Sequence, residues 1–195
     1  MKIDIARQPL VPAFMTLFAL AVAAMCAGIP VSDTSGAVRD ALPLLGGQLA
    51  RFQAAYPVWS KFAAGFMLLF TGMCAGRITI RYNLYTVGTC LPIPLYAIVA
   101  CGIATGGNYL AGFAASMLLA LATKNYCRAF CNGYGFDAIF RASLYLGLMP
   151  LIYAPALPLL LLLPLAVLLF RRTFREVVVA TAGLLLPIFT ACYVS

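Results

Sequence analysis

The sequence predicts an all-α protein, a polytopic transmembrane helical bundle of about seven membrane segments with its N-terminus inside and its C-terminus outside. Composition is the first reason, because 64% of the residues are hydrophobic and only 9% are charged, too few to cover a water-soluble globule. Charge placement is the second, because ten of the 13 Lys and Arg residues fall on alternate breaks between apolar stretches. Cationic side chains collect on the cytoplasmic side of a membrane, so the alternation predicts an orientation. We expect a single integral membrane domain over residues 1–195.

The first apolar segment covers residues 9–29, about 20 residues and enough to cross a hydrocarbon core of about 30 Å. A cleaved signal peptide is the alternative. The apolar core is longer than that of most signal peptides, and Pro30 follows the small residues near its end, which favours an uncleaved anchor. The long polar stretch that follows has leucines and aromatics at helical spacing, which predicts an amphipathic helix over residues 37–55 on the outer surface.

The next three segments are expected at residues 56–76, 85–104 and 109–123. Tyr56 and Trp59 begin the first of them and suit the level of the lipid headgroups. Proline residues near the start of segment 85–104 predict a helix that is kinked or begins late. Small residues in these segments would allow close contact between helices; they are Gly65, Gly72, Gly76, Gly112, Ala115 and Ser116.

The apolar stretch after Arg141 poses the main topological question, because it could form one long helix or two short ones. A single crossing would separate Arg141 from the arginines that follow the stretch, whereas a hairpin that turns near Tyr153 returns both to the cytoplasm. We therefore expect segments at residues 140–153, 155–170 and 177–195. A re-entrant hairpin of two half-length segments would give the same charge pattern.

Histidine is absent from the sequence, which removes the commonest metal ligand and the usual general base at neutral pH. We expect no metal site and no cofactor. None of the five acidic residues falls at the centre of a predicted segment, where a proton-coupled carrier would be expected to place one.

Asp33 and Asp40 lie in the long loop after the first segment and are the candidates for catalysis. A carboxylate there could act as a general base, or could bind a divalent cation that neutralises a leaving diphosphate. Alternatively, Asp33 begins a turn, and Asp40 pairs with Arg39 or caps the amphipathic helix. The structural interpretation is the favoured one.

Membrane lipids are the expected partners, because the cations flank apolar segments and form no separate basic domain of the kind that binds nucleic acid. Contacts with anionic headgroups are expected at Arg77, Arg81, Arg171, Arg172 and Arg175. The last three of these, with Glu176, could instead bind one specific phosphate-bearing lipid or a membrane-protein partner.

Three motifs carry a resemblance to a known family: F-R-A-S-L-Y-L-G-L-M-P-L-I-Y-A-P-A-L at residues 140–157, R-R-T-F-R-E at 171–176 and A-G-L-L-L-P at 182–187. With the basic break before L-P-I-P-L-Y at residues 91–96, they resemble a family of uncharacterised multi-pass inner-membrane proteins of Bacteroidota. The resemblance covers most of the chain. It implies a helical inner-membrane protein of the cell envelope.

The hairpin with Gly147, Pro155 and an arginine-rich loop is more distantly similar to the membrane module of polyprenyl-phosphate-sugar-dependent glycosyltransferases. That resemblance implies a long outer loop with acidic residues, where Asp33 and Asp40 lie. The leading hypothesis is a non-enzymatic subunit or scaffold in envelope assembly. The alternatives are a reduced lipid-linked sugar glycosyltransferase and a facilitator of a small apolar or lipid-like solute.

Overall fold

The computed structural model describes residues 10–26, 44–82, 90, 92–104, 109–131, 135–169 and 174–194. Within these ranges the protein is all-α, as predicted, and no β-strand occurs in them. The seven membrane segments and the orientation of the termini stay predictions. The chain divides into two compact units, each described by itself below. Unit 1 comprises Met1–Gly36 and Ala50–Met117, and unit 2 comprises Ala37–Leu49 and Leu118–Ser195. The single membrane domain stays a prediction.

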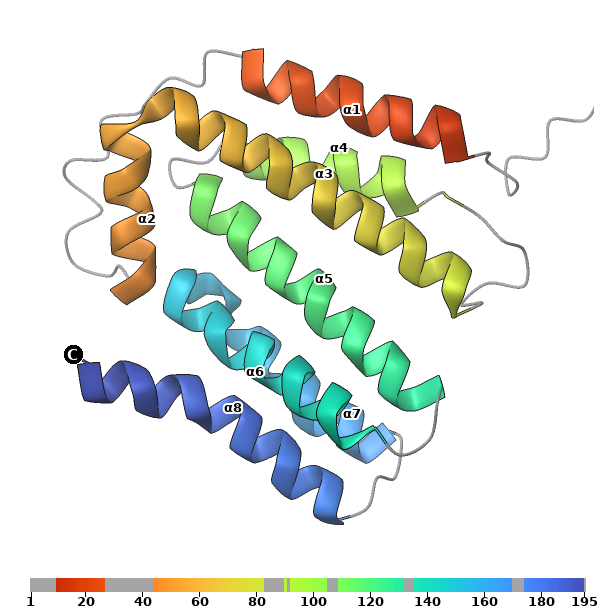
Figure 1. Ribbon diagram of the computed structural model, residues 1–195, viewed down its shortest axis with the longest axis vertical. Coiled ribbons are helices and arrows are strands. Elements are labelled where there is room, and N and C mark those ends of the chain that lie inside the picture. Colours follow the sequence, from red (N-terminus) through yellow and green to blue (C-terminus); the bar gives the residue numbers. More distant parts are fainter. Residues whose placement is uncertain are drawn as a thin grey trace, which may run out of the picture. The chain divides into compact units, whose positions relative to one another are not determined.

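The helices are, in chain order, α1 (Leu10–Cys26), α2 (Leu44–Ala55), α3 (Pro57–Arg81), α4 (Pro92–Ala104), α5 (Tyr109–Cys131), α6 (Phe136–Ile152), the 3-10 helix η1 (Ala154–Leu161), α7 (Leu162–Leu169) and α8 (Phe174–Val194) (Figure 1). Proline marks several of their boundaries. Pro57 and Pro92 begin α3 and α4, at a position where the missing amide hydrogen costs no helical hydrogen bond.

The bounds of several helices differ from the predicted segments. The described part of the predicted amphipathic helix is α2, which begins at Leu44, and residues 37–43 lie outside the described ranges. Helix α4 begins at Pro92, later than the predicted start at residue 85. Helix α5 continues to Cys131 instead of ending at residue 123, because Lys and Arg propagate a helix well and Asn125 bonds the Leu121 carbonyl one turn back.

The stretch between Tyr153 and residue 170 is not one α-helix. Tyr153 is extended, and residues 154–161 form the 3-10 helix η1 before α7 begins. Pro155 and Pro158 explain the difference, since neither has an amide hydrogen to donate to an α-helical bond. The predicted break at Tyr153 therefore coincides with the end of α6.

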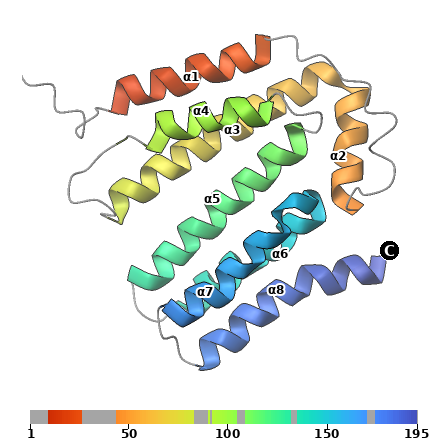
Figure 2. The same ribbon diagram turned by 180° about the vertical axis from the view of Figure 1, so that it is seen from behind.

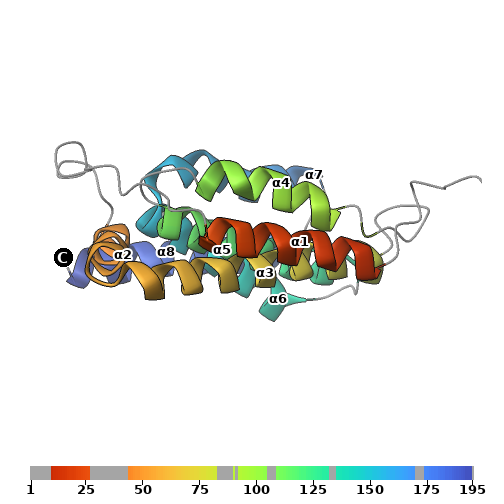
Figure 3. The same cartoon turned by 90° about the horizontal axis from the view of Figure 1, so that it is seen from above.

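In unit 1, α1 packs against both α3 and α4, which also contact each other (Figure 3). Glycines of α3 make room for the two neighbours. Leu17 of α1 lies over Gly72, and Ile93 of α4 lies over Gly76, and both apolar side chains are fully buried. Gly72 and Gly76 therefore allow the close helix contact that their small size predicts.

In unit 2, α6 is followed by a reversal at Tyr153, so that η1 packs against α6 and α7 returns toward the end where α6 began (Figures 1 and 2). Helix α8 then packs along α6 in the parallel direction. Consequently the C-terminus of α5 and the N-termini of α6 and α8 lie at the same end of this unit (Figure 1). We call it the charged end, because the described Lys, Arg, Asp and Glu residues of unit 2 all lie there; they are Lys124, Arg128, Asp137, Arg141, Arg175 and Glu176.

The contact between α6 and α8 depends on two glycines. A Cβ atom added at Gly147 would lie 2.5 Å from the Leu184 carbonyl oxygen, and one added at Gly183 would lie 2.7 Å from the Phe140 carbonyl oxygen. Real Cβ atoms do not approach backbone oxygens this closely. The two helices can therefore touch backbone to backbone only because both positions lack a side chain.

Replacing these glycines by alanine tests the difference between the two kinds of contact. We expect Gly147→Ala and Gly183→Ala to lower the free energy of unfolding by about 1–3 kcal/mol each, because a backbone carbonyl cannot rotate away. Gly72→Ala and Gly76→Ala should cost less, since the Leu17 and Ile93 side chains that they meet can change rotamer. SDS titration in mild detergent, followed by circular dichroism, measures the difference.

Ala182→Val is the matched control, because Ala182 is exposed beside Gly183 on the same helix. Equal losses at all four glycines would contradict backbone contact between α6 and α8.

Candidate functional site

The surface of α3 is the most distinctive feature among the described residues. Its outward face carries large apolar side chains, with Trp59, Phe62 and Phe66 exposed by 69%, 61% and 68%. Its buried residues are mostly small or polar; they are Ser60, Ala64, Gly65, Leu68, Thr71, Gly72, Gly76, Ile78 and Thr79. This distribution is the reverse of that in a water-soluble helix. Two described helices, Pro57–Arg81 and Phe174–Tyr193, are long and apolar enough to cross a membrane.

The two ends of α3 differ in chemistry. Tyr56 and Trp59 lie exposed at its N-terminal end, and Arg77 and Arg81 lie exposed at its C-terminal end. A spacing of four residues places both arginines on one face, and cations are favoured where a helix exposes its last carbonyl groups. At about 1.5 Å per residue, the helix rises about 27 Å from Trp59 to Arg77, close to the thickness of a hydrocarbon core of about 30 Å.

The predicted headgroup contacts fall partly within the described residues. Arg77, Arg81 and Arg175 are all exposed. Arg171 and Arg172 lie outside the described residues, as do the catalytic candidates Asp33 and Asp40.

Hydroxyl groups inside unit 1 bond one helix to another. The Ser60 and Tyr109 hydroxyls lie 2.6 Å apart in a fully buried contact, while Ser60 Oγ donates to the Pro57 carbonyl at 2.8 Å. Since a serine hydroxyl has one hydrogen, the Tyr109 hydroxyl is the donor between the two side chains. The Gln53 side-chain oxygen accepts from the Leu110 amide nearby, at 3.4 Å. These two hydrogen bonds connect the first residues of α5 to the end of α2 and the start of α3.

A second, partly buried contact joins α4 to α5. The Tyr96 hydroxyl lies 3.2 Å from Ser116 Oγ, which donates to the Phe113 carbonyl at 2.8 Å. A nucleophilic serine needs an adjacent general base, whereas Ser60 and Ser116 bond to phenol groups and to carbonyls of their own helices. This geometry suits structural hydrogen bonds between helices and not acyl transfer.

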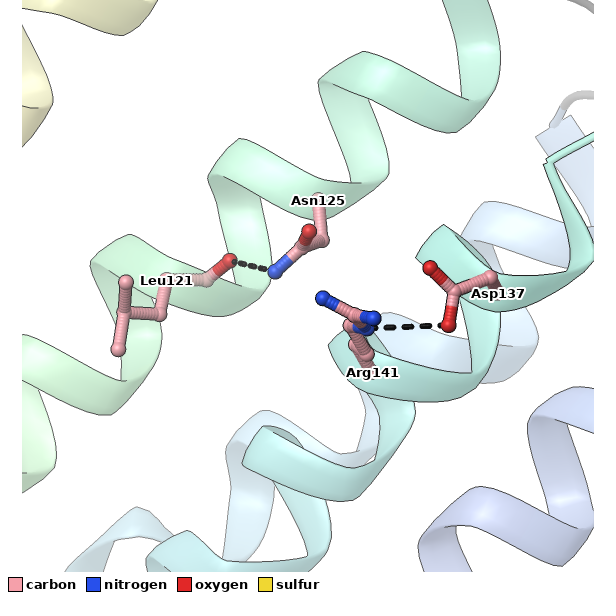
Figure 4. Close-up of polar contacts among 4 residues, drawn as sticks. All are labelled: Leu121, Asn125, Asp137 and Arg141. Carbon is pink, nitrogen blue, oxygen red and sulfur yellow. Dashed lines mark hydrogen bonds and ion pairs between the residues drawn. The ribbon is translucent and has the colours of Figure 1, made fainter.

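The charged end of unit 2 holds an exposed ion pair and a buried acid. Arg141 Nε donates to Asp137 Oδ1 at 3.0 Å, one turn apart on α6, with side chains that are 58% and 71% exposed (Figure 4). Glu176, in the first turn of α8, is only 3% exposed. From the sequence, Glu176 is expected near the N-terminus of a helix, where a negative charge is favourable. The sequence does not indicate that its side chain is buried.

In the part of the chain that the structure describes, no three His, Cys, Asp or Glu residues gather into a group that could hold a metal ion. No family model, curated protein or solved structure matches the chain in comparisons with each. The two family resemblances that the sequence suggests therefore stay predictions.

Sequence reasoning missed the pairing of Ser60 with Tyr109. The two residues are 49 positions apart in the chain, and no local sequence pattern relates them.

Proposed function

We propose that this chain is an integral, multi-pass protein of the inner membrane that serves as a non-enzymatic subunit or scaffold in envelope assembly. It would cross the bilayer about seven times, with its N-terminus inside and its C-terminus outside. The outward face of α3 is the observation that carries the membrane assignment. Exposed large apolar side chains from Val58 to Ile80, along most of a helix of 25 residues, would be costly in water and are favourable against lipid acyl chains.

The scaffold assignment draws support from the polar groups inside the helices. Hydrogen bonds between hydroxyls join α5 to α3 and to α4 in unit 1, and backbone contact holds α6 against α8 in unit 2. Such contacts favour a fixed arrangement of helices over a moving gate. The buried Ser60 hydroxyl is engaged by the Pro57 carbonyl and the Tyr109 hydroxyl, contacts that suit a structural role.

Replacing Phe66 tests the membrane assignment. Phe66→Asp should reduce the amount of protein retained in membranes after carbonate washing, because an aspartate at the centre of a membrane helix costs about 3 kcal/mol on insertion scales. Phe66→Leu keeps an apolar side chain and should behave as the wild type does. Recovery of folded Phe66→Asp protein in the soluble fraction, at wild-type helicity, would show that α3 faces water.

Labelling of single cysteines with a membrane-impermeant thiol reagent, in a cysteine-free background, tests the topology. The outer positions should react in intact cells; they are Ser35, Thr105, Ala154 and Ser195. Thr123 and Thr173 should react only after the membrane is opened. Protection of Ala154 together with labelling of Ser195 from inside alone would replace the proposed topology with six crossings.

Neutralising the acidic loop residues separates a scaffold from a glycosyltransferase. A scaffold should keep its membrane-protein partners in Asp33→Asn and Asp40→Asn variants, as judged by co-purification in mild detergent. Its affinity for polyprenyl diphosphate should also be the same in the presence and in the absence of Mg²⁺. Magnesium-dependent binding that either substitution abolishes would favour the transferase, because a divalent cation neutralises the diphosphate of such a substrate.

A further inference from the structure

The charged end of unit 2 presents three cations around one turn of α5. Lys124 and Arg128 are exposed and four residues apart, so they share a face of α5, and Arg128 is three residues from Asn125 on the same surface. The Asn125 side chain is fixed, because its Nδ2 donates to the Leu121 carbonyl at 2.9 Å. This turn of α5 therefore has a hydrogen-bonded amide with exposed cationic side chains beside it.

Arg141 approaches the same turn from α6. Its Nε is held by Asp137 at 3.0 Å, and one terminal guanidinium nitrogen is directed toward the turn of α5 that holds Asn125 (Figure 4). An arginine has five N–H groups in a planar fork, so the terminal nitrogens keep donors that a phosphate can accept. Asp137 orients the guanidinium and at the same time lowers the net positive charge of the cluster.

We propose that Lys124, Arg128 and Arg141 form a binding site for the phosphate headgroup of an anionic phospholipid, and that Asp137 limits its affinity. The proposal rests on the membrane location proposed above. Charge complementarity selects the occupant, because three cations and one acid leave an excess of two positive charges. The site adjoins apolar helix: α6 carries no charged residue beyond Arg141, and neither does α5 before Lys124. A lipid can therefore place its headgroup at the cations while its acyl chains follow the apolar surface.

Native mass spectrometry of the delipidated full chain in detergent tests the site, with phosphatidylglycerol and phosphatidylcholine of identical acyl chains as the probes. The ratio of their affinities should favour phosphatidylglycerol. Arg128→Gln and Arg141→Gln should each reduce this ratio by about fivefold, the effect of one cation at an anionic surface. Asp137→Asn should raise it, because the change removes a negative charge and releases the Arg141 guanidinium.

Arg51→Gln is the matched control, since it removes one exposed positive charge that belongs to unit 1 and should leave the ratio unchanged. If the ion pair had only a structural role, Asp137→Asn would lower the ratio of phosphatidylglycerol to phosphatidylcholine affinity or leave it unchanged. Either result would contradict the role proposed for Asp137. A wild-type ratio in Arg128→Gln or Arg141→Gln would overturn the site. Displacement of the lipid by inorganic phosphate at equal phosphate concentration would show a site for free phosphate and would also overturn the assignment to lipid.

Carbonate washing of wild-type membranes distinguishes failure of this site from failure of the membrane assignment. Release of the chain into the supernatant would contradict the membrane location and the lipid site with it. Retention in the pellet with equal affinity for the two lipids would contradict the headgroup site alone.

Discussion

Helices that turn their large apolar side chains outward must hold together through small residues and hydroxyl groups, and the other features of both units follow from this constraint. On α3 the aromatics face outward, and its buried face consists mostly of glycine, alanine, serine and threonine, with Leu68 and Ile78. Small residues bury little apolar area, and dispersion contacts at short range must supply the attraction instead. Gly72 and Gly76 provide such contacts, since each receives an apolar side chain from a neighbouring helix.

The same constraint governs the polar groups. A buried hydroxyl away from water costs free energy unless it is bonded, and Ser60, Thr71 and Thr79 each donate to a carbonyl three or four residues back in α3. Their oxygen atoms can still accept, which is how Tyr109 binds Ser60. Charged side chains cannot be satisfied in this way. Among the described residues of unit 2 they are accordingly confined to one end, with the apolar parts of α6 and α8 beyond them.

Much of this architecture could be predicted from the sequence, because composition and charge placement are properties of single segments. The all-α fold, the start of α3 beside Tyr56 and the reversal at Tyr153 all follow from local patterns of apolar residues and proline. The bonds between helices could not be predicted. The contacts of Ser60 with Tyr109, and of Gly183 with the Phe140 carbonyl, depend on the register between helices that are distant in the chain. The 3-10 form of η1 was also missed, since four prolines near the hairpin predict only interruption and not the kind of helix that results.

Asp137 separates two functions that the same cations can serve. Membrane orientation depends on the number of Lys and Arg residues near a segment, and acidic residues contribute little to it. Headgroup binding depends on net charge, to which an acid contributes fully. In the topology proposed above, an exposed carboxylate paired with Arg141 would therefore lower lipid affinity without changing the orientation predicted from Lys124, Arg128 and Arg141. Since an exposed pair of this kind adds at most about 1 kcal/mol to stability, its effect on the charge of this surface is the larger physical consequence.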